Sequence, residues 1–347
     1  MYNAINAVFR ERVVAKGLNP GQRGALILRK WQKYRRPVAV GLDASRFDQH
    51  VSVAALEWEH SIYNALFKDA ELAELLRWQL FNRGVGYCGD GKVGYAKRGT
   101  RGSGDMNTSL GNVLLMCGMV HRFLEDKGIS ASFINDGDDC VLIMEEQELH
   151  KMKGLRDWFL RFGFSMKQEE PVRVFEQIEF CQSHPVMVGS NAIMVRNPRK
   201  AFGGDLVTLK ARTLKEYSNH LTAVGVCGGV LSSGVPIHQG FYASMRRNGS
   251  GRILDIKKDV WLMGMGFTHM ALLTDPSLVV NEVGIEARTR VSYWRAFGIT
   301  PDQQLLVEAH YRSVTRATLL VDDKTGYLIN NNKLKNKAIS YIIKNGT

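Results

Sequence analysis

The sequence predicts a mixed α/β fold of the α+β kind, in which a small antiparallel sheet is flanked by helices. Two segments predict the sheet: PVAVGLDA, an apolar run that reaches an aspartate, and SASFINDGDDCVLIME, which has apolar runs on both sides of a tight turn at Gly137. Helical patterns between these segments predict the flanking helices. The largely helical pattern after Asn191 predicts a second, mostly helical part of the chain.

Local signals predict the elements that come before the tight turn. Residues 1–36 are basic and mostly helical in pattern, and Pro37 separates them from the strand. Residues 51–82 are rich in strong helix formers. The glycine-rich, basic stretch 84–104 predicts a hairpin or a mobile loop. Residues 105–128 predict a long helix, because polar capping residues stand at its start and a glycine at its end.

Further elements are expected after the turn. Residues 146–162 predict a helix, and residues 172–189 predict two short strands. Beyond Asn191 helices are expected, with a break near the segment SSGVP. The lysine-rich end of the chain predicts a basic tail.

Charge and cysteine content limit the possible partners. The 347 residues include 46 Lys and Arg against 34 Asp and Glu, a formal net charge of +12. This charge favours a polyanionic partner, with nucleic acid ahead of an anionic membrane surface.

Five cysteines, without CxxC pairs or zinc-binding spacing, predict free thiols and no disulfides. The longest apolar stretch, residues 261–273, is too short to span a bilayer, so no transmembrane segment is expected.

The segment INDGDDCVLI places three carboxylates on the tight turn. Asp136, Asp138 and Asp139 surround Gly137 between two apolar runs. Adjacent carboxylates in a half-buried site repel one another unless a cation is present. A hard divalent cation such as Mg²⁺ prefers oxygen ligands. The alternative is an exposed acidic turn, because Asp and Gly are common turn residues.

A second acidic element ends the first predicted strand. Asp43 stands at the end of the apolar run, and Asp48 follows five residues later. If the strands that carry Asp43 and Asp138 lie in one sheet, their carboxylates can share two metal ions and support phosphoryl transfer. The alternative for Asp48 is an N-cap of the next helix.

The third element is GTRGSGDMNTSLGN, at residues 99–112. Its glycines allow the backbone to approach a ligand closely, and Ser103, Asn107 and Thr108 supply short polar side chains. The helix N-terminus that follows favours anions. A plain capped helix is the alternative.

Taken in order, four segments resemble a known family. VGLDASRFDQHVS, GTRGSGDMNTSLGN, NDGDDCVLI and EFCQSHP are similar to motifs A, B, C and E of viral RNA-dependent RNA polymerases. The closest resemblance is to the tombusvirus and carmovirus group of positive-strand RNA viruses. Upstream, KGLNPGQRG and KWQKYRRPVAV also resemble that group, and so do NPRKAF, AVGVCGGVLSSGVPIHQGFY and YWRAFGITPDQQ downstream.

The resemblance implies a right-hand polymerase built of palm, fingers and thumb. The implied divisions are a remnant of fingers and palm-entry helices at 1–36, a palm at 37–190 with a fingers insertion around 60–100, a mostly helical thumb at 191–325 and a basic tail at 326–347. The basic motif F of the fingers has no match here, so most of the N-terminal fingers is expected to be absent. A fragment or one half of a split polymerase is therefore expected, with a fingers segment or companion replicase protein as a partner.

The resemblance also implies roles for single residues. Asp43 and Asp138 would be the principal ligands of two Mg²⁺ ions, for which Mn²⁺ can substitute, and Asp139 a supporting ligand. Asp48 and Asn107 would read the ribose 2′-hydroxyl of the incoming nucleotide. The other implied roles are placement of nucleotide and template by Ser103 and Thr108, protonation of the leaving pyrophosphate by Lys167, triphosphate contact or charge neutralisation by Arg46, and a grip on the primer end by the turn of Phe180, Cys181 and Gln182.

The expected activity is therefore RNA synthesis on an RNA template from nucleoside triphosphates, in the replication of a positive-strand RNA genome. Such a chain is expected in the host cytoplasm, at membrane-associated replication complexes that it reaches through a partner. Two alternatives remain open: an RNA-binding chain that does not polymerise alone, and a reverse transcriptase. The pair of Asp48 and Asn107 favours ribonucleotide substrates and therefore argues against a reverse transcriptase.

Overall fold

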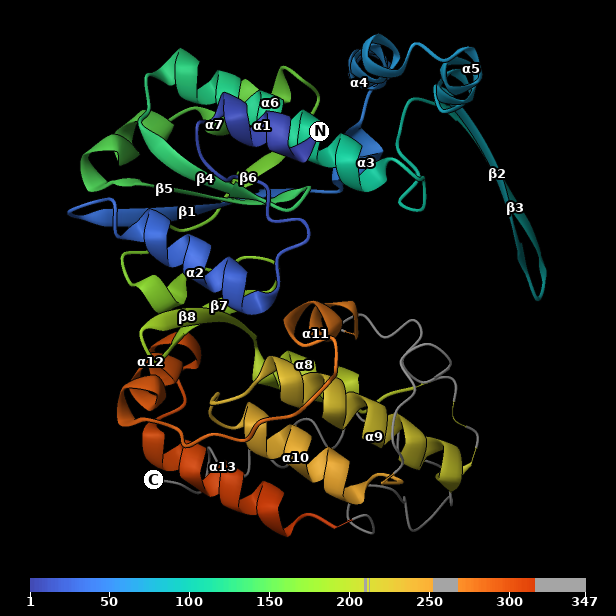
Figure 1. The fold of residues 1–347 in the computed structure, drawn as a ribbon. Coiled ribbons are helices and arrows are strands. Elements are labelled where there is room, and N and C mark those ends of the chain that lie inside the picture. Colours follow the sequence, from blue (N-terminus) through green and yellow to red (C-terminus); the bar gives the residue numbers. More distant parts are fainter. Residues whose placement is uncertain (209–210, 212, 252–267, 316–347) are drawn as a thin grey trace. The chain divides into compact units, whose positions relative to one another are not determined.

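The computed structural model describes residues 1–208, 211, 213–251 and 268–315 (Figure 1). The predicted basic tail at 326–347 lies outside the described residues, as does most of the apolar stretch 261–273. The chain divides into two compact units. Unit 1 comprises Met1–Lys16 and Lys30–Arg173, and unit 2 comprises Gly17–Arg29 and the chain from Val174 onward.

Unit 1 combines a small sheet with helices and a separate hairpin. In chain order its elements are α1 (Tyr2–Val8), β1 (Pro37–Ala44), α3 (Phe47–His50), α4 (Val53–Phe67), α5 (Ala70–Trp78), β2 (Phe81–Cys88), β3 (Gly91–Arg98), α6 (Thr108–Lys127), β4 (Ala131–Asn135), β5 (Asp139–Glu145), the 3₁₀ helix η1 (Glu146–Met152), α7 (Leu155–Leu160) and β6 (Met166–Gln168).

The sheet of unit 1 has four antiparallel strands in the order β4-β5-β1-β6. Successive side chains of β1 point to opposite faces, since the side-chain period of a strand is two. Val38, Val40 and Leu42 face the main core of the unit, together with Phe123 of α6 and Phe133 of β4. The opposite face of β1 therefore carries Asp43. The predicted small antiparallel sheet with flanking helices is confirmed.

Most of the local predictions in unit 1 are also confirmed. The hairpin predicted within 84–104 forms as β2 and β3, but it begins at Phe81, inside the segment 51–82 that was predicted to be helical. Helix α6 is 20 residues long and ends at Gly128, whose left-handed backbone (φ 59°) suits a residue without a Cβ. The single helix predicted at 146–162 is wrong. Gly154 has φ 84°, which no right-handed helix accommodates, so η1 ends there and α7 starts anew.

Unit 2 consists mainly of helices, as predicted for the chain beyond Asn191. Its elements are α2 (Pro20–Trp31, shared with unit 1 at its end), the 3₁₀ helix η2 (Phe175–Gln177), β7 (Ser183–Val188), β8 (Asn191–Arg196), α8 (Pro198–Asp205), α9 (Leu214–Leu231), α10 (His238–Asn248), α11 (Thr268–Thr274), α12 (Ala287–Phe297) and α13 (Pro301–Ser313). Strands β7 and β8 form an antiparallel pair.

Two expectations for unit 2 are corrected. Of the two strands predicted at 172–189 only the second forms, because residues 175–177 turn into η2. Helix does not start directly after Asn191, because residues 191–196 form β8 against β7. The predicted break at SSGVP is confirmed, since α9 ends at Leu231 and α10 begins at His238.

Aromatic side chains form the core of unit 2. Phe202 stacks on Phe241 with ring centroids 3.9 Å apart, and Tyr242 and Tyr293 are buried beside them. Helices α9 and α10 approach closely at Gly225, where a Cβ would lie 2.6 Å from the backbone nitrogen of Arg246.

All five cysteines are free thiols. None of the described helices has both the length and the apolar character needed to cross a lipid bilayer.

Candidate active site

Three charged side chains form one row across the sheet of unit 1. Asp43 of β1 lies opposite Asp139 of β5 on one side and opposite Lys167 of β6 on the other. Directly opposed residues of antiparallel strands carry their side chains on the same face, with Cβ atoms about 5 Å apart. Asp43 and Lys167 are exposed, and Asp139 is the first residue of β5. The row therefore brings together two of the predicted metal ligands and the predicted general acid.

The turn between β4 and β5 holds the adjacent carboxylates in place. Asn135 donates a hydrogen bond from Nδ2 to the carbonyl of Gly137 (2.6 Å) and accepts one at Oδ1 from the Gly137 backbone nitrogen (3.1 Å). The backbone nitrogen of Asp136 donates to the carbonyl of Asp139 (2.9 Å). Gly137 has φ 100°, a conformation that side chains with a Cβ rarely adopt. The sequence NDGDD thus encodes a tight turn that presents Asp138 beside Asp139.

The carboxylates of this turn interact unfavourably with one another. Loss of hydration raises the pKa of the Asp139 carboxyl to about 6, and the negative charges of Asp138, Asp136, Glu169 and Asp43 add to the increase. Lys16 forms an ion pair with Asp136, with Nζ 2.6 Å from Oδ1. A divalent cation near Asp139 would favour its charged form and relieve the repulsion.

Glu169 is a carboxylate of this site that the sequence reasoning did not select. Its backbone nitrogen donates to the carbonyl of Gly41 (2.9 Å), and its side chain lies over that glycine. A Cβ on Gly41 would lie 1.9 Å from Oε2 of Glu169. Gly41 and Asp43 lie on the same face of β1, so Glu169 joins the carboxylates of that face. The sequence signal for this contact was Gly41 itself, because a glycine inside a strand of valine and leucine often marks the close approach of another group.

A pocket of about 340 Å³ lies beside Asp138 and is lined by Asp48, Ser103, Asn112 and Lys16 among others. The carboxylate of Asp48 accepts hydrogen bonds from the Ser103 hydroxyl and from Nδ2 of Asn112 (2.8 Å to Oδ1). The pocket therefore joins three segments of unit 1: the start of α3, the loop before α6, and the β4–β5 turn.

The alternative role of Asp48 as a helix N-cap does not agree with the structure. Asp48 lies inside α3, and the N-cap of that helix is Arg46, without a side-chain capping bond. The following helix, α4, is capped by Ser52, whose hydroxyl accepts from the backbone nitrogen of Ala55 (3.2 Å). Asp48 is thus available for a role in the pocket.

Asn107 lies in a different cluster from Asp48. Its Nδ2 donates to Glu59 (2.9 Å) and to Gln79 (3.1 Å), and its Oδ1 accepts from Nε2 of Gln79 (2.9 Å). Glu59 is fully buried and forms an ion pair with the buried Arg101. These contacts occupy the amide of Asn107 on both sides, and they fix the start of α6.

Asn112 is the amide that the structure brings to Asp48, and the sequence reasoning did not select it. It follows Thr108 by four residues in α6, so both lie on the same face of the helix. Thr108 donates from its hydroxyl to the carbonyl of Gly102 (2.7 Å) and stabilises the preceding loop. The alternative of a plain capped helix is not supported, because the N-cap residue Asn107 makes no side-chain capping bond. The sequence signal for Asn112 was its helical spacing within GTRGSGDMNTSLGN, which places it on the same face as Thr108.

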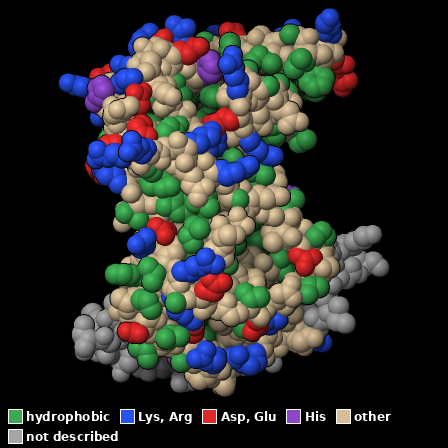
Figure 2. All heavy atoms as spheres, turned by 60° about the vertical axis from the view of Figure 1, so that its left-hand side comes forward, with side chains coloured by type: hydrophobic (Ala, Val, Ile, Leu, Met, Phe, Trp, Pro, Cys, Tyr) green, Lys and Arg blue, Asp and Glu red, His purple; other side chains and the backbone are tan. Residues whose placement is uncertain are grey.

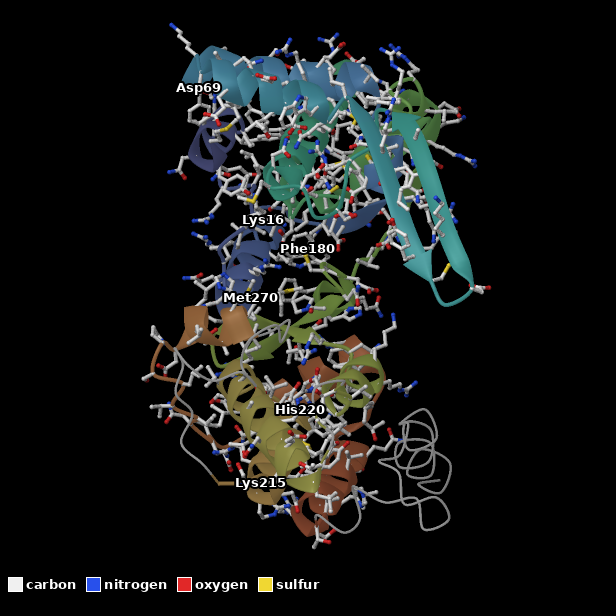
Figure 3. All side chains as sticks on the ribbon, turned by 90° about the vertical axis from the view of Figure 1, so that its right-hand side faces the viewer. Lys16, Asp69, Phe180, Lys215, His220 and Met270 are labelled. Carbon is white, nitrogen blue, oxygen red and sulfur yellow. The ribbon has the colours of Figure 1, made fainter. Side chains whose placement is uncertain are left out.

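The remaining predicted site residues lie in strained turns. Arg46 is exposed and has φ 49°. In unit 2, Cys181 and Gln182 have φ 51° and 55°, and they form a two-residue turn between Phe180 and Ser183, which exchange backbone hydrogen bonds of 3.0 and 3.2 Å. Phe180 is buried, which anchors the turn (Figure 3). Left-handed backbone at residues other than glycine is uncommon and is often associated with functional sites.

Comparison with known proteins identifies the family. A family model described as viral RNA dependent RNA polymerase matches residues 1–318. The chain belongs to this family. It is 42% identical over 313 residues to the RNA-directed RNA polymerase of Tobacco necrosis virus (strain A), and 40% identical over 329 residues to that of Turnip crinkle virus. It is also 41% identical over 320 residues to the putative RNA-directed RNA polymerase of Barley yellow dwarf virus (isolate PAV).

These matches cover most of this chain and a smaller part of each relative. They cover 89%, 94% and 90% of this chain, in the order given above. The chain spans 42%, 42% and 36% of the length of the same relatives. The predicted resemblance to polymerases of the tombusvirus and carmovirus type is confirmed.

Membership in this polymerase family implies a divalent cation. The three carboxylates of Asp43, Asp138 and Asp139, called the acidic row below, fit one in chemistry. Asp43, Asp138 and Asp139 offer only oxygen donors, which hard divalent cations prefer. Loss of hydration and the neighbouring negative charges raise the pKa of the Asp139 carboxyl, and a bound cation would offset both effects. In the described part of the chain, however, no three His, Cys, Asp or Glu side chains are already arranged as a metal-binding group. The carboxylates would therefore have to adjust when a cation binds.

Proposed function

We propose that this chain catalyses RNA synthesis on an RNA template from nucleoside triphosphates, as part of the replication of a positive-strand viral RNA genome. The observation that carries the proposal is the row of Asp43 and Asp139 on neighbouring strands, with Asp138 beside the pocket that contains Asp48. The printed names of the relatives, RNA-directed RNA polymerase, support the same activity.

The proposed architecture is that of a right-hand polymerase. We assign residues 37–190 to the palm, with a fingers insertion around 60–100 that includes α4, α5 and the β2–β3 hairpin, and residues 191–325 to the thumb. Residues 1–36 would be a remnant of fingers and palm-entry helices. The boundary between the compact units lies at Arg173 and Val174, so residues 174–190 share a unit with the proposed thumb.

The acidic row would hold two Mg²⁺ ions, with Mn²⁺ as a substitute, through Asp43, Asp138 and Asp139. When bound, such ions favour ionisation of an attacking hydroxyl and stabilise charge on a leaving phosphate oxygen. The carboxylates position the ions and are themselves kept in place by the β1–β5 ladder and the Gly137 turn. Glu169 adds negative charge on the same face.

Lys167 is proposed to donate a proton to the leaving pyrophosphate. It lies next to Asp43 in the sheet register and is exposed, so its ammonium group can reach a bound triphosphate. Arg46 is exposed on the turn that follows Asp43 and would contact the triphosphate or neutralise the carboxylates.

Selection of ribonucleotides is proposed to depend on the pocket beside Asp138. A 2′-hydroxyl can donate to the carboxylate of Asp48 and accept from an amide. The hydrogen bond between Asn112 and Asp48 makes Asn112 the amide best supported for this role, with Ser103 as a third partner. The role of Asn107 as a direct sugar contact stays a prediction, since its amide is engaged by Glu59 and Gln79.

Contacts to RNA are proposed for two further elements. Thr108 would help to place nucleotide and template through the loop before α6, and the turn of Phe180, Cys181 and Gln182 would grip the primer end. The net charge of +12 favours binding to the RNA backbone, and Figure 2 shows lysine and arginine side chains spread over one face of the described residues.

An RNA-binding subunit that needs a separate fingers chain is the second candidate. The net charge of +12 favours it, because this charge alone would support RNA binding. Association with membrane-bound replication complexes in the cytoplasm, through a partner, is proposed for either candidate.

The test is primer extension on an RNA template with Mg²⁺ or Mn²⁺, comparing the wild-type chain with Asp138→Ala. Synthesis by the wild type alone would support the enzyme, provided that circular dichroism and RNA binding of the variant are unchanged. Asp157→Asn, at an exposed carboxylate of α7, is the matched control and should keep full activity. If neither chain is active, a fingers segment supplied in trans would separate the candidates: rescue supports the enzyme, and continued inactivity with retained RNA binding supports the subunit. Preference for deoxynucleotides would instead indicate a reverse transcriptase.

A further inference from the structure

The β2–β3 hairpin extends from α5 as a two-stranded ribbon (Figures 1 and 3). It is a sheet of its own, separate from the four-stranded sheet. Every residue of β3 is exposed, and so are the outer residues of β2 from Val85 onward. A two-stranded ribbon has little core of its own, so its side chains are free to serve a binding role.

The two faces of the hairpin differ in composition. The register pairs Phe81 with Arg98 and Tyr87 with Lys92, and Arg83 lies two residues after Phe81 and four before Tyr87. Because side chains alternate along a strand, all five project from one face. We call this the basic-aromatic face after Phe81, Arg83, Tyr87, Lys92 and Arg98. The exposed Val85 lies on the same face, between Arg83 and Tyr87.

The aromatic rings of this face are open to solvent. Tyr87 is 84% exposed and Phe81 is 43% exposed. The guanidinium of Arg83 lies over the ring of Phe81, 4.9 Å from its centroid. The small residues Gly94 and Ala96 lie on the same face. Because Arg83 covers the Phe81 ring on one side, Tyr87 is the aromatic ring that is more open to a planar ligand.

The charge of the hairpin indicates the class of that ligand. Residues 81–98 contain four basic side chains and one acidic side chain, Asp90. Exposed aromatic rings interleaved with lysine and arginine are typical of surfaces that bind single-stranded nucleic acid, because bases stack on the rings while cations contact the phosphates. A purely apolar protein partner would leave these cations without counter-charges.

We propose that the basic-aromatic face of the β2–β3 hairpin binds single-stranded RNA, with a base stacked on Tyr87 and phosphates contacted by Arg83, Lys92 and Arg98. The inference rests on the proposed function for its substrate class, and it adds an RNA contact outside the acidic row and its pocket. The opposite face of the hairpin provides matched controls. There, Tyr95 covers Gly84, with ring atoms 2.3 Å from where a Cβ would stand, and Lys97 is the basic residue.

The first test measures binding of a fluorescein-labelled 12-nucleotide oligouridylate by anisotropy, with the whole chain, in EDTA and without nucleoside triphosphates. Tyr87→Ala should weaken binding about 5- to 150-fold, the usual range for loss of one stacked base. Tyr87→Phe keeps the ring and should stay within about threefold of wild type. Equal binding by wild type and Tyr87→Ala would overturn the proposal.

The second test uses salt dependence. The double variant Arg83→Gln, Lys92→Gln should lower the slope of log affinity against log salt by about 1.4, or about 0.7 for each lost phosphate contact to a single strand. Lys97→Gln, on the opposite face, should leave the slope unchanged. An equal fall for Lys97→Gln would mean general charge attraction and would contradict a specific face. Loss of concentration-dependent self-association in the variants, with RNA binding intact, would indicate a protein partner instead.

The Asp138→Ala chain separates this inference from the proposed function. If Asp138→Ala abolishes synthesis, and adding Tyr87→Ala to that chain still weakens RNA binding, the RNA-binding face and the proposed activity both stand. If Tyr87→Ala weakens RNA binding but the chain makes no RNA even with a fingers segment supplied in trans, the RNA-binding face stands and the proposed activity is overturned. If the chain synthesises RNA but Tyr87→Ala leaves RNA binding unchanged, the proposed activity stands and the RNA-binding face is overturned.

Discussion

Asp43 and Asp139 lie directly opposite each other on the antiparallel strands β1 and β5. Their positions in the sequence are nearly a hundred residues apart, and the ladder from Pro37↔Glu145 to Asp43↔Asp139 holds them in register. Such placement of two carboxylates costs free energy unless a cation binds between or beside them. The arrangement is therefore better suited to binding an ion than to stabilising the fold.

The first prediction follows from the raised pKa of the Asp139 carboxyl, from 3.8 to about 6. Between these values the folded chain binds more protons than the unfolded chain, so the free energy of unfolding should fall as pH rises from about 4 to about 6 and stay low above that. Asp139→Asn removes this titration and should make the metal-free chain more stable than wild type at pH 7 and above. Urea unfolding in EDTA from pH 4 to 8 would measure it.

The matched control for this prediction is Asp157→Asn, which should keep the wild-type pH dependence. Addition of Mg²⁺ should stabilise wild type more than Asp139→Asn. Identical pH profiles for wild type and Asp139→Asn would contradict the prediction.

The second prediction distinguishes Asn107, the residue just before α6, from Asn112 within α6. Asn112→Ala should reduce discrimination between ribo- and deoxynucleotides about tenfold, because loss of one hydrogen bond to a charged partner costs about 1.5 kcal/mol. Asn107→Ala should act mainly on stability, since its amide contacts Glu59 and Gln79. Incorporation ratios and thermal unfolding of both variants would test this. A loss of discrimination only in Asn107→Ala would restore Asn107 to the sugar contact.

The third prediction concerns the buried ion pair of Glu59 and Arg101, whose residues are 0% and 5% exposed. Arg101→Met leaves the Glu59 charge buried and should cost about 3–5 kcal/mol of stability. The double variant Glu59→Gln, Arg101→Met keeps an acceptor for Tyr63 and Asn107 and should recover most of that loss. Chemical unfolding measures both, and a double variant as unstable as Arg101→Met would refute the account.

The fourth prediction tests the close approach of α9 and α10. Gly225→Ala would place a Cβ 2.6 Å from the backbone nitrogen of Arg246 and 2.9 Å from the carbonyl oxygen of Tyr242. Because backbone atoms cannot move aside, we expect a loss of about 1–3 kcal/mol. Gly204→Ala in α8 has nothing within 4 Å and should be neutral or stabilising by up to about 1 kcal/mol. Equal stability of the two variants would show that the helices can separate without cost.

Local sequence signals were sufficient for most elements of unit 1. The apolar run 37–44, the turn at Gly137 and the helix that ends at Gly128 were all predicted, because each depends on residues that are neighbours in the chain. The same kind of signal failed at Gly154, where a positive φ breaks the predicted helix. A glycine inside a helical pattern does not by itself reveal which backbone conformation it will adopt.

By itself the sequence determined the helix and strand pattern of the first half of the chain, its basic character, the polymerase motifs and the residues expected to bind metal. Only the tertiary structure decided which side chains meet: Asn112 rather than Asn107 beside Asp48, Lys167 next to Asp43, and Glu169 over Gly41. Asp48 and Asn112 are 64 residues apart, and the hydrogen bond between them depends on how α3 and α6 pack on one core. Periodicity assigns a residue to a face of its own element, but the partner on another element follows from packing, which no local pattern encodes.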